Sequence, residues 1–324
     1  MEQPPGYVDS RFPNHVCKLK KSLYSLKQAP RAWFHRFSSF MLRLGFLCSR
    51  ADTSLFVLIR SSSIIYLLLY VDDIVVTGND DALLRDFIQR LHREFATKDL
   101  GPLSYFLGLE VSSSATGLFL SQAKYAHDIL ARAQLLDSKP YLTITRLDLA
   151  YAVNSVSQYM QSPTVDHFQA VKRILCNVKG TLHYGLSFSH SPPTSILAYS
   201  NVDWAGYPDT HCSTSGYAIF LGENLVSWSA KKQPTVSHSS CEFEYRALAL
   251  MASEVTWLSH LLRDLKVSLN HRPLLLCDNK SAIFLALNLV SHKRAKHIDL
   301  DYHIVRDLAA SGAIQPQYVP SHLQ

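Results

Sequence analysis

Two adjacent carboxylates, Asp72 and Asp73, interrupt one of the most apolar stretches of the chain, IIYLLLYVDDIVVTG at residues 64–78. Burial of an unpaired charge costs several kcal/mol or forces a pKa shift, so both side chains need an exposed turn, a cationic partner or a metal ion. Turn chemistry alone favours a tight turn between two apolar strands. The same geometry would let the two carboxylates hold Mg²⁺, which prefers oxygen ligands.

A second candidate site lies in the C-terminal half, where two glutamates open a long helical pattern. Glu244 shares one helical stripe with apolar residues that must face a sheet, whereas Glu242 lies about 200° away around the helix. Glu242 also follows Ser239 with the spacing of a capping box, which indicates a structural role. We therefore expect Glu244 to point towards the sheet. The stripe consists of Leu248, Met251, Val255, Leu258 and Leu262.

Asp278 follows the apolar strand LLLC, so we expect it at the end of that strand, above the sheet. A turn shared with Asn279 is the structural alternative, and the residues alone leave both open. The motif KHIDLDYH at residues 296–303 also offers potential metal ligands, but its spacing matches no standard zinc site and favours a solvated helix face. Those ligands are His297, Asp299, Asp301 and His303.

The hydrophobic pattern predicts the elements that would position these residues. The first half reads as a helix, a strand, a strand–turn–strand and a second helix, at 29–46, 53–60, 64–78 and 80–95. The stretch 141–190 is mostly helical in pattern. From 191 the pattern predicts a strand and then a hairpin that turns at Gly222 to Asn224. The remaining elements are a helix over 240–265, a strand over 273–279, shorter helices through 281–311 and a strand over 314–320.

Composition indicates a globular chain. Its 324 residues suggest roughly two domains of about 150 residues each, and 47% apolar content allows sizeable cores. The formal charge of +6 modestly favours an anionic partner. Six cysteines without a CxxC pair indicate neither a zinc site nor a disulfide framework. No secretion signal or membrane-length apolar run is apparent, so we expect an intracellular protein, cytoplasmic or nuclear, that is not secreted and has no membrane partner.

Eight motifs occur together in one order along the chain. They are LYSLKQAPRAW (23–33), YVDD (70–73), YFLGLEV (105–111), AYSNVDWAG (198–206), STSGY (213–217), EFEYRALA (242–249), LCDNKSA (276–282) and KHIDLDYH (296–303). In this order they resemble the reverse transcriptase and ribonuclease H portion of a copia-type retrotransposon polyprotein. The resemblance covers nearly the whole chain.

For the first half, the resemblance implies the fingers and palm of a polymerase that extends DNA on an RNA template. Asp72 and Asp73 would be metal ligands at the tip of a hairpin, with Asp72 the principal one. Lys27, Gln28 and Arg31 would lie beside the incoming nucleotide and template, although the residues alone fit a solvated helix entry equally well. YFLGLEV would grip the primer strand, where ordinary core packing of its apolar residues is the alternative.

For the second half, the resemblance implies a ribonuclease H-like domain, in which four carboxylates hold two metal ions that cleave the RNA of an RNA–DNA hybrid. Asp203, Glu244 and Asp278 are the candidate catalytic residues, and Glu244 and Asp278 the candidate metal ligands. The implied cofactor is Mg²⁺ or Mn²⁺. The implied partners are RNA, DNA and the hybrid.

The chain departs from the family at positions that the chemistry requires. Asn201 stands where the family carries its first ribonuclease H aspartate, and an amide cannot supply that anionic ligand. The family also separates the segments that meet near Pro140–Tyr141 by several tens of residues, which indicates an internal deletion. We further expect the third polymerase aspartate to lie upstream of Met1, and the fourth ribonuclease H carboxylate to follow the final YVPSHLQ.

These observations predict an α/β (α+β) fold, with a partial reverse transcriptase at 1–135, a shortened connection at 136–190 and a ribonuclease H-like domain with a mixed sheet at 191–324. The favoured function is a reverse transcriptase/ribonuclease H fragment with little or no remaining activity. The alternative is a nucleic-acid-binding or interaction protein without catalysis, because cations cluster in residues 17–31 and 291–297 and could neutralise phosphates.

Overall fold

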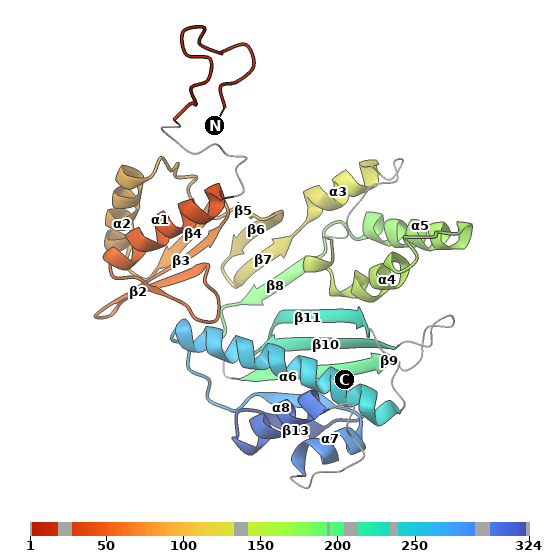
Figure 1. Cartoon of the computed structure of the whole chain (residues 1–324). Helices are drawn as coiled ribbons and strands as arrows, with labels where there is room; N and C mark the ends of the chain where they lie inside the picture. The colour runs from red at the N-terminus through yellow and green to blue at the C-terminus, as the bar shows by residue number, and fades with distance from the viewer. Residues whose placement is uncertain are drawn as a thin grey trace. The chain divides into compact units, whose positions relative to one another are not determined.

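The computed structural model divides the chain into two compact units, Met1–Thr97 and Lys98–Gln324 (Figure 1). The three domains expected at 1–135, 136–190 and 191–324 stay a prediction. None of the helices in the described part of the chain is long and apolar enough to cross a membrane. The described residues are 2–18, 28–132, 142–192, 195–203, 213–233, 239–288 and 299–321.

The first unit contains a small antiparallel sheet with two helices on one face. Its elements are α1 (Ala29–Arg43), β1 (Leu47–Cys48), β2 (Leu55–Arg60), β3 (Ser63–Tyr70), β4 (Asp73–Gly78) and α2 (Asp81–Glu94). The strands lie in the order β1-β2-β3-β4, and each pairs antiparallel with the next. The predicted helix, hairpins and second helix are therefore confirmed.

Local sequence explains where the helices of this unit begin. Proline occupies the first turn of α1, where its missing N–H costs nothing. Asp80 caps α2 by accepting hydrogen bonds from the backbone N–H groups of Ala82 and Leu83, and the Leu83 bond is the main cause that lowers the pKa of Asp80. Both helices bury one stripe against the sheet. This core includes Phe37, Met41, Phe56, Ile65, Leu67, Phe87 and Leu91.

The second unit begins with a four-stranded antiparallel sheet, in the order β5-β6-β7-β8, and three α-helices. The elements up to β8 are β5 (Tyr105–Phe106), β6 (Leu109–Ser114), β7 (Gly117–Ser121), α3 (Ala123–Arg132), the 3₁₀ helix η1 (Leu142–Ile144), α4 (Leu147–Ser157), α5 (Val165–Gly180) and β8 (Gly185–Ser189). The stretch 141–190 is mostly helical as predicted, apart from β8 at its end. The helices share a small core of Ala126, Ile129, Leu149 and Val178.

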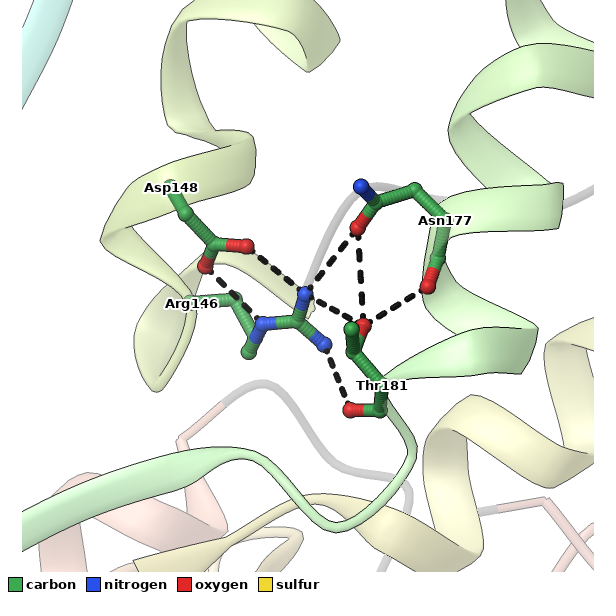
Figure 2. Close-up of polar contacts among 4 residues, drawn as sticks. All are labelled: Arg146, Asp148, Asn177 and Thr181. Atoms are coloured by element: carbon green, nitrogen blue, oxygen red, sulfur yellow. Dashed lines mark hydrogen bonds and ion pairs between the residues drawn. The ribbon is translucent and has the colours of Figure 1, made fainter.

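A buried arginine joins two of these helices (Figure 2). Arg146, only 4% exposed, donates from Nε and Nη2 to the two carboxylate oxygens of Asp148, over 2.9 and 2.7 Å. The same guanidinium reaches the end of α5, where it donates to the carbonyl and hydroxyl oxygens of Thr181 and to Asn177 Oδ1. Its hydrogen bonds are the main cause that lowers the pKa of Asp148. The start of α4 is thereby fixed to the end of α5.

The rest of the second unit is a five-stranded mixed sheet with helix α6 lying across it (Figure 1). Its order is β11-β10-β9-β12-β13: the first three strands form an antiparallel meander, and β12 pairs parallel with both β9 and β13. This arrangement confirms the predicted mixed α/β fold class. The elements are β9 (Ile196–Asp203), β10 (Thr214–Leu221), β11 (Asn224–Lys232), α6 (Ser240–Asp264), β12 (Leu274–Cys277), α7 (Lys280–Leu287), α8 (Asp299–Ala310) and β13 (Gln315–Tyr318).

Helix α6 packs its predicted stripe into the largest core of the molecule. Ser239 caps the helix by accepting a hydrogen bond from the Glu242 backbone N–H. Beyond this cap, the apolar residues at helical spacing meet the buried side chains of β9, β10 and β12. The core includes Ile196, Ala198, Ile219, Leu248, Met251, Val255 and Leu275. The position of α6 across the sheet is thus fixed by the phase of its apolar stripe.

Candidate functional site

The two aspartates of the first unit lie at an exposed hairpin tip. Strands β3 and β4 pair so that Tyr70 faces Asp73 across the turn, with Val71 and Asp72 as the two turn residues. Asp72 and Asp73 are both exposed, so the predicted turn removes the cost of burying their charges. Val71 has φ 51°, a left-handed conformation that a β-branched residue rarely adopts. The tip is therefore held in a strained shape.

The residues expected near the nucleotide lie at the start of α1. Gln28 is the N-cap residue, and its side chain makes no capping hydrogen bond. Arg31 is in the first helical turn, and both side chains are exposed. Lys27 lies outside the described residues. This exposure fits a solvated helix entry as well as a nucleotide contact, so the roles of all three stay predictions.

The motif YFLGLEV forms the tight turn between β5 and β6. Leu107 and Gly108 both have positive φ, and Leu107 is 42% exposed, so Leu107 is not a core residue. The Glu110 carboxylate accepts hydrogen bonds from the Lys124 backbone N–H at 2.8 Å and from the Ser121 hydroxyl at 3.4 Å. Glu110 therefore fixes β6 to the start of α3, while the proposed primer grip stays a prediction.

Glu244 and Asp278 come together in the second unit, as the sequence predicts. Helix α6 carries Glu244 over the end of β12, and Asp278 immediately follows that strand. Potential ligand atoms of Glu244, Asp278 and Cys277 all lie within 4.8 Å of one another. They form the sole group of three or more such side chains in the described residues, and we call it the carboxylate–thiol cluster. The sequence pattern places Cys277 in an apolar strand, so Cys277 was not predicted to belong to this cluster.

Burial dominates the electrostatics of this cluster. It raises the pKa of Glu244 to about 7, with a further contribution from the nearby charge of Asp278. Burial likewise raises the pKa of the Cys277 thiol to about 12, so the thiol keeps its proton and donates to Glu244 Oε2 at 3.9 Å. Glu242, also buried, pairs with Arg246 at 2.8 Å instead. The choice of Glu244 as the sheet-facing glutamate is confirmed.

Asn201 and Asp203 lie on β9, beside the cluster's strand. Ser200 pairs with Cys277, so Asn201 is the next residue along β9 towards the end where Asp278 lies. The Asn201 side-chain oxygen accepts a hydrogen bond from the Val202 backbone N–H at 2.6 Å. Asp203, the last residue of β9, is exposed and accepts a 3.1 Å hydrogen bond from the Tyr151 hydroxyl of α4. Asp203 is not a member of the carboxylate–thiol cluster.

The KHIDLDYH motif is described in part. Residues Asp299 to His303 belong to α8, whereas His297 lies outside the described residues. His303 is exposed and contacts Arg306 through its Nδ1 atom at 2.9 Å. The exposure of His303 agrees with the predicted solvated helix face, whereas the side chains of Asp299 and Asp301 lie outside the described part of the chain.

The donor set of the carboxylate–thiol cluster fits a hard divalent cation. Two carboxylates offer oxygen ligands at close range. A cation between them would offset both the burial of Glu244 and the repulsion by Asp278, which together raise the pKa of Glu244. The protonated thiol of Cys277 is a poor ligand for such an ion. Glu244 and Asp278 are therefore the residues that could hold Mg²⁺ or Mn²⁺.

Comparison with known proteins identifies the region to which the chain corresponds. Residues 1–146 match the family described as reverse transcriptase (RNA-dependent DNA polymerase). The whole chain is 44% identical to 24% of the retrovirus-related Pol polyprotein from transposon RE1 of Arabidopsis thaliana. It is 46% identical, over 60% of its length and 94% of the relative's, to the uncharacterized mitochondrial protein AtMg00810 of the same plant. Among solved structures, that of LC11-RNase H1, a protein isolated from compost, is 13% identical to this chain. The match covers 40% of this chain and 87% of LC11-RNase H1, with a TM-score of 0.32.

The alignment with the RE1 polyprotein also bears on the internal deletion predicted near Pro140–Tyr141. It runs over 357 positions, 33 more than the 324 residues of this chain, so it includes positions that this chain lacks. The chain spans about a quarter of the length of the Pol polyproteins that it matches. It belongs to the Pol polyproteins of copia-type retrotransposons and contains their reverse transcriptase region.

Proposed function

We propose that the second unit is a weakened ribonuclease H site, in which Glu244 and Asp278 hold a divalent cation for cleavage of RNA in an RNA–DNA hybrid. One observation carries this proposal: the two carboxylates, 34 residues apart in the sequence, converge within 4.8 Å beside a buried strand end. When bound, Mg²⁺ or Mn²⁺ activates water and stabilises the leaving oxygen in this chemistry. Glu244 must be ionised to act as a ligand, which its pKa of about 7 allows at slightly alkaline pH.

Asn201 is the feature that weakens the site. It is the next residue of β9 beyond the pair Ser200–Cys277, and it offers a neutral amide oxygen already bonded to the backbone. A neutral ligand offsets less of the charge of the cation than a carboxylate does. Asp203 is held by Tyr151 and is not in the cluster, which makes it a poor replacement.

For the first unit, we propose the role of a polymerase palm. The exposed carboxylates of Asp72 and Asp73 support it, because an exposed hairpin tip can present both side chains to a metal ion and a triphosphate. Gln28 and Arg31, exposed at the start of α1, would contact the nucleotide together with Lys27. RNA, DNA and their hybrid are accordingly the proposed partners of the chain.

Hybrid cleavage tests the ribonuclease H proposal directly. The wild-type chain, Asn201→Asp, and Asn201→Asp combined with Glu244→Gln would be incubated with a labelled hybrid in Mg²⁺ and in Mn²⁺. We expect weak or no cleavage by wild type, a gain from Asn201→Asp, and loss of that gain when Glu244 is replaced. Cleavage that survives Glu244→Gln would contradict the proposed site. Primer extension by wild type and Asp72→Asn tests the palm in the same preparations.

Binding without catalysis is the alternative outcome. The cation clusters at 17–31 and 291–297 that favour it lie largely or wholly outside the described residues. Such binding would be weak, strongly salt-dependent and indifferent to base sequence, because phosphate contacts release counterions and read no bases. A hybrid that is bound with these properties but not cleaved by Asn201→Asp would favour this alternative.

A further inference from the structure

The last described strand brings a hydroxyl group to the carboxylate–thiol cluster. Strand β13 pairs parallel with β12, which places Tyr318 beside Cys277. The ladder continues one step further, because the Val319 backbone N–H donates to the Cys277 carbonyl at 3.0 Å. The chain then turns so that the Ser321 hydroxyl donates to Asp278 Oδ2 at 2.7 Å.

This hydrogen bond is short and charge-assisted. A neutral donor on an ionised carboxylate at this distance makes one of the stronger hydrogen bonds in proteins and restricts rotation of the carboxylate. Asp278 is otherwise a half-buried side chain at a strand end, and among the described residues no backbone N–H group donates to its carboxylate. With Oδ2 engaged by Ser321, reorientation of the second oxygen is restricted as well.

The anchor that holds Ser321 is itself well defined. Beside the β12–β13 ladder, the Lys280 ammonium lies over the ring of Tyr318, 4.8 Å from its centroid. Lys280 is in the first turn of α7, two residues after Asp278, so this contact joins the segment that follows Asp278 to β13. Strand pairing and this cation–π contact together limit the movement of the segment that carries the hydroxyl.

We propose that Ser321 is a positioning residue for Asp278, holding its carboxylate in the orientation that can share a divalent cation with Glu244. The inference rests on the cation site proposed above. Ser321 acts through Asp278 and is not itself a ligand. Partners that orient metal-binding carboxylates typically change metal affinity by 10- to 100-fold when they are removed. Because Ser321 is exposed, its loss should change metal affinity far more than stability.

Manganese binding to the full chain tests this role without any measurement of activity. Bound Mn²⁺ would be measured by electron paramagnetic resonance for wild type, Ser321→Ala, Ser321→Thr and Ser311→Ala. Ser311 is a matched control, because it is exposed on the same unit and its hydroxyl donates only locally, to the Leu308 carbonyl. We expect roughly tenfold weaker binding for Ser321→Ala, near-complete rescue by threonine and no change for Ser311→Ala.

Glu244→Gln separates failure of this inference from failure of the proposed function. If Glu244→Gln loses Mn²⁺ binding while Ser321→Ala binds as wild type does, the positioning role is refuted and the cation site stands. If Glu244→Gln binds Mn²⁺ as wild type does, or wild type binds none, the cation site itself is refuted and the role of Ser321 falls with it. Thermal unfolding in EDTA should be alike for all serine variants, and a large loss for Ser321→Ala would mean that the hydroxyl supports the fold instead.

Discussion

Replacement of Glu244 by glutamine should stabilise the chain at alkaline pH, although it removes a proposed ligand. Burial and the charge of Asp278 raise the pKa of Glu244 from 4.5 to about 7 in the native state. As the pH rises from about 4.5 to about 7, the unfolded chain loses this proton first, so native stability falls across that window. The pKa difference corresponds to about 3 kcal/mol above pH 7, as an upper value. Glutamine keeps the shape of the side chain and carries no charge, so the free-energy cost of burying an ionised carboxylate near Asp278 is absent.

Urea denaturation in EDTA at about pH 5 and about pH 8 measures this difference. We expect Glu244→Gln to be more stable than wild type by up to about 3 kcal/mol at the higher pH and by much less at the lower pH. Glu223→Gln is the control, because Glu223 is exposed in the turn between β10 and β11 and should show no such pH dependence.

Addition of Mg²⁺ gives the second half of the test. A cation that binds only the native state stabilises it, so Mg²⁺ should raise the stability of wild type and not that of Glu244→Gln. Equal stability of wild type and Glu244→Gln at the higher pH would refute the argument from burial. Equal responses of both proteins to Mg²⁺ would refute Glu244 as a ligand.

Three further predictions concern Arg146, Val71 and Cys277. Arg146→Met should lower the free energy of unfolding by about 3 kcal/mol, which is at the low end for a broken buried ion pair because Asp148 is half exposed. The control Arg173→Met, at an exposed position of α5, should lower it by less than about 0.5 kcal/mol. Urea denaturation measures both, and equal losses would contradict the role of Arg146. Val71→Gly should raise the free energy of unfolding by about 1 kcal/mol by relieving the left-handed backbone, and a loss of stability would contradict the strain. A thiol reagent should label the exposed Cys176 in the native state, as measured by mass spectrometry. It should label the buried Cys277, whose pKa is about 12, only after unfolding. Rapid labelling of Cys277 in the native state would contradict its burial.

Local patterns predicted the elements and which of two glutamates faces the sheet. The turn between β3 and β4, the hairpin at Gly222 to Asn224 and helix α6 all follow from period and turn chemistry. The phase of the helical stripe was sufficient to choose Glu244 over Glu242, because a difference of two residues places side chains on opposite faces of a helix. These features depend on residues close together in the sequence.

Features that depend on distant pairing were not predictable in the same way. Cys277 reads as one more apolar residue of a buried strand, and only the crossing of α6 over β12 places its thiol beside Glu244. The bond between Tyr151 and Asp203 joins residues 52 positions apart, and it requires the packing of α4 near the end of β9. The left-handed backbone of Val71 is a local feature, but it was not predictable from the sequence either, because such a position is usually marked by glycine.

The parallel pairing of β12 with β9 and β13 has a consequence for the order of folding. Strands β9, β10 and β11 follow one another in the sequence and can pair as soon as they leave the ribosome. Strand β12 pairs with β9 across 77 residues, from Leu197 to Leu274, and β13 joins only at the edge that β12 provides. Loop closure of this length delays the parallel half of the sheet. During synthesis the meander should therefore exist for several seconds, at about 5–20 residues per second, before Asp278 and Ser321 emerge, with one edge of β9 open to pairing by another chain.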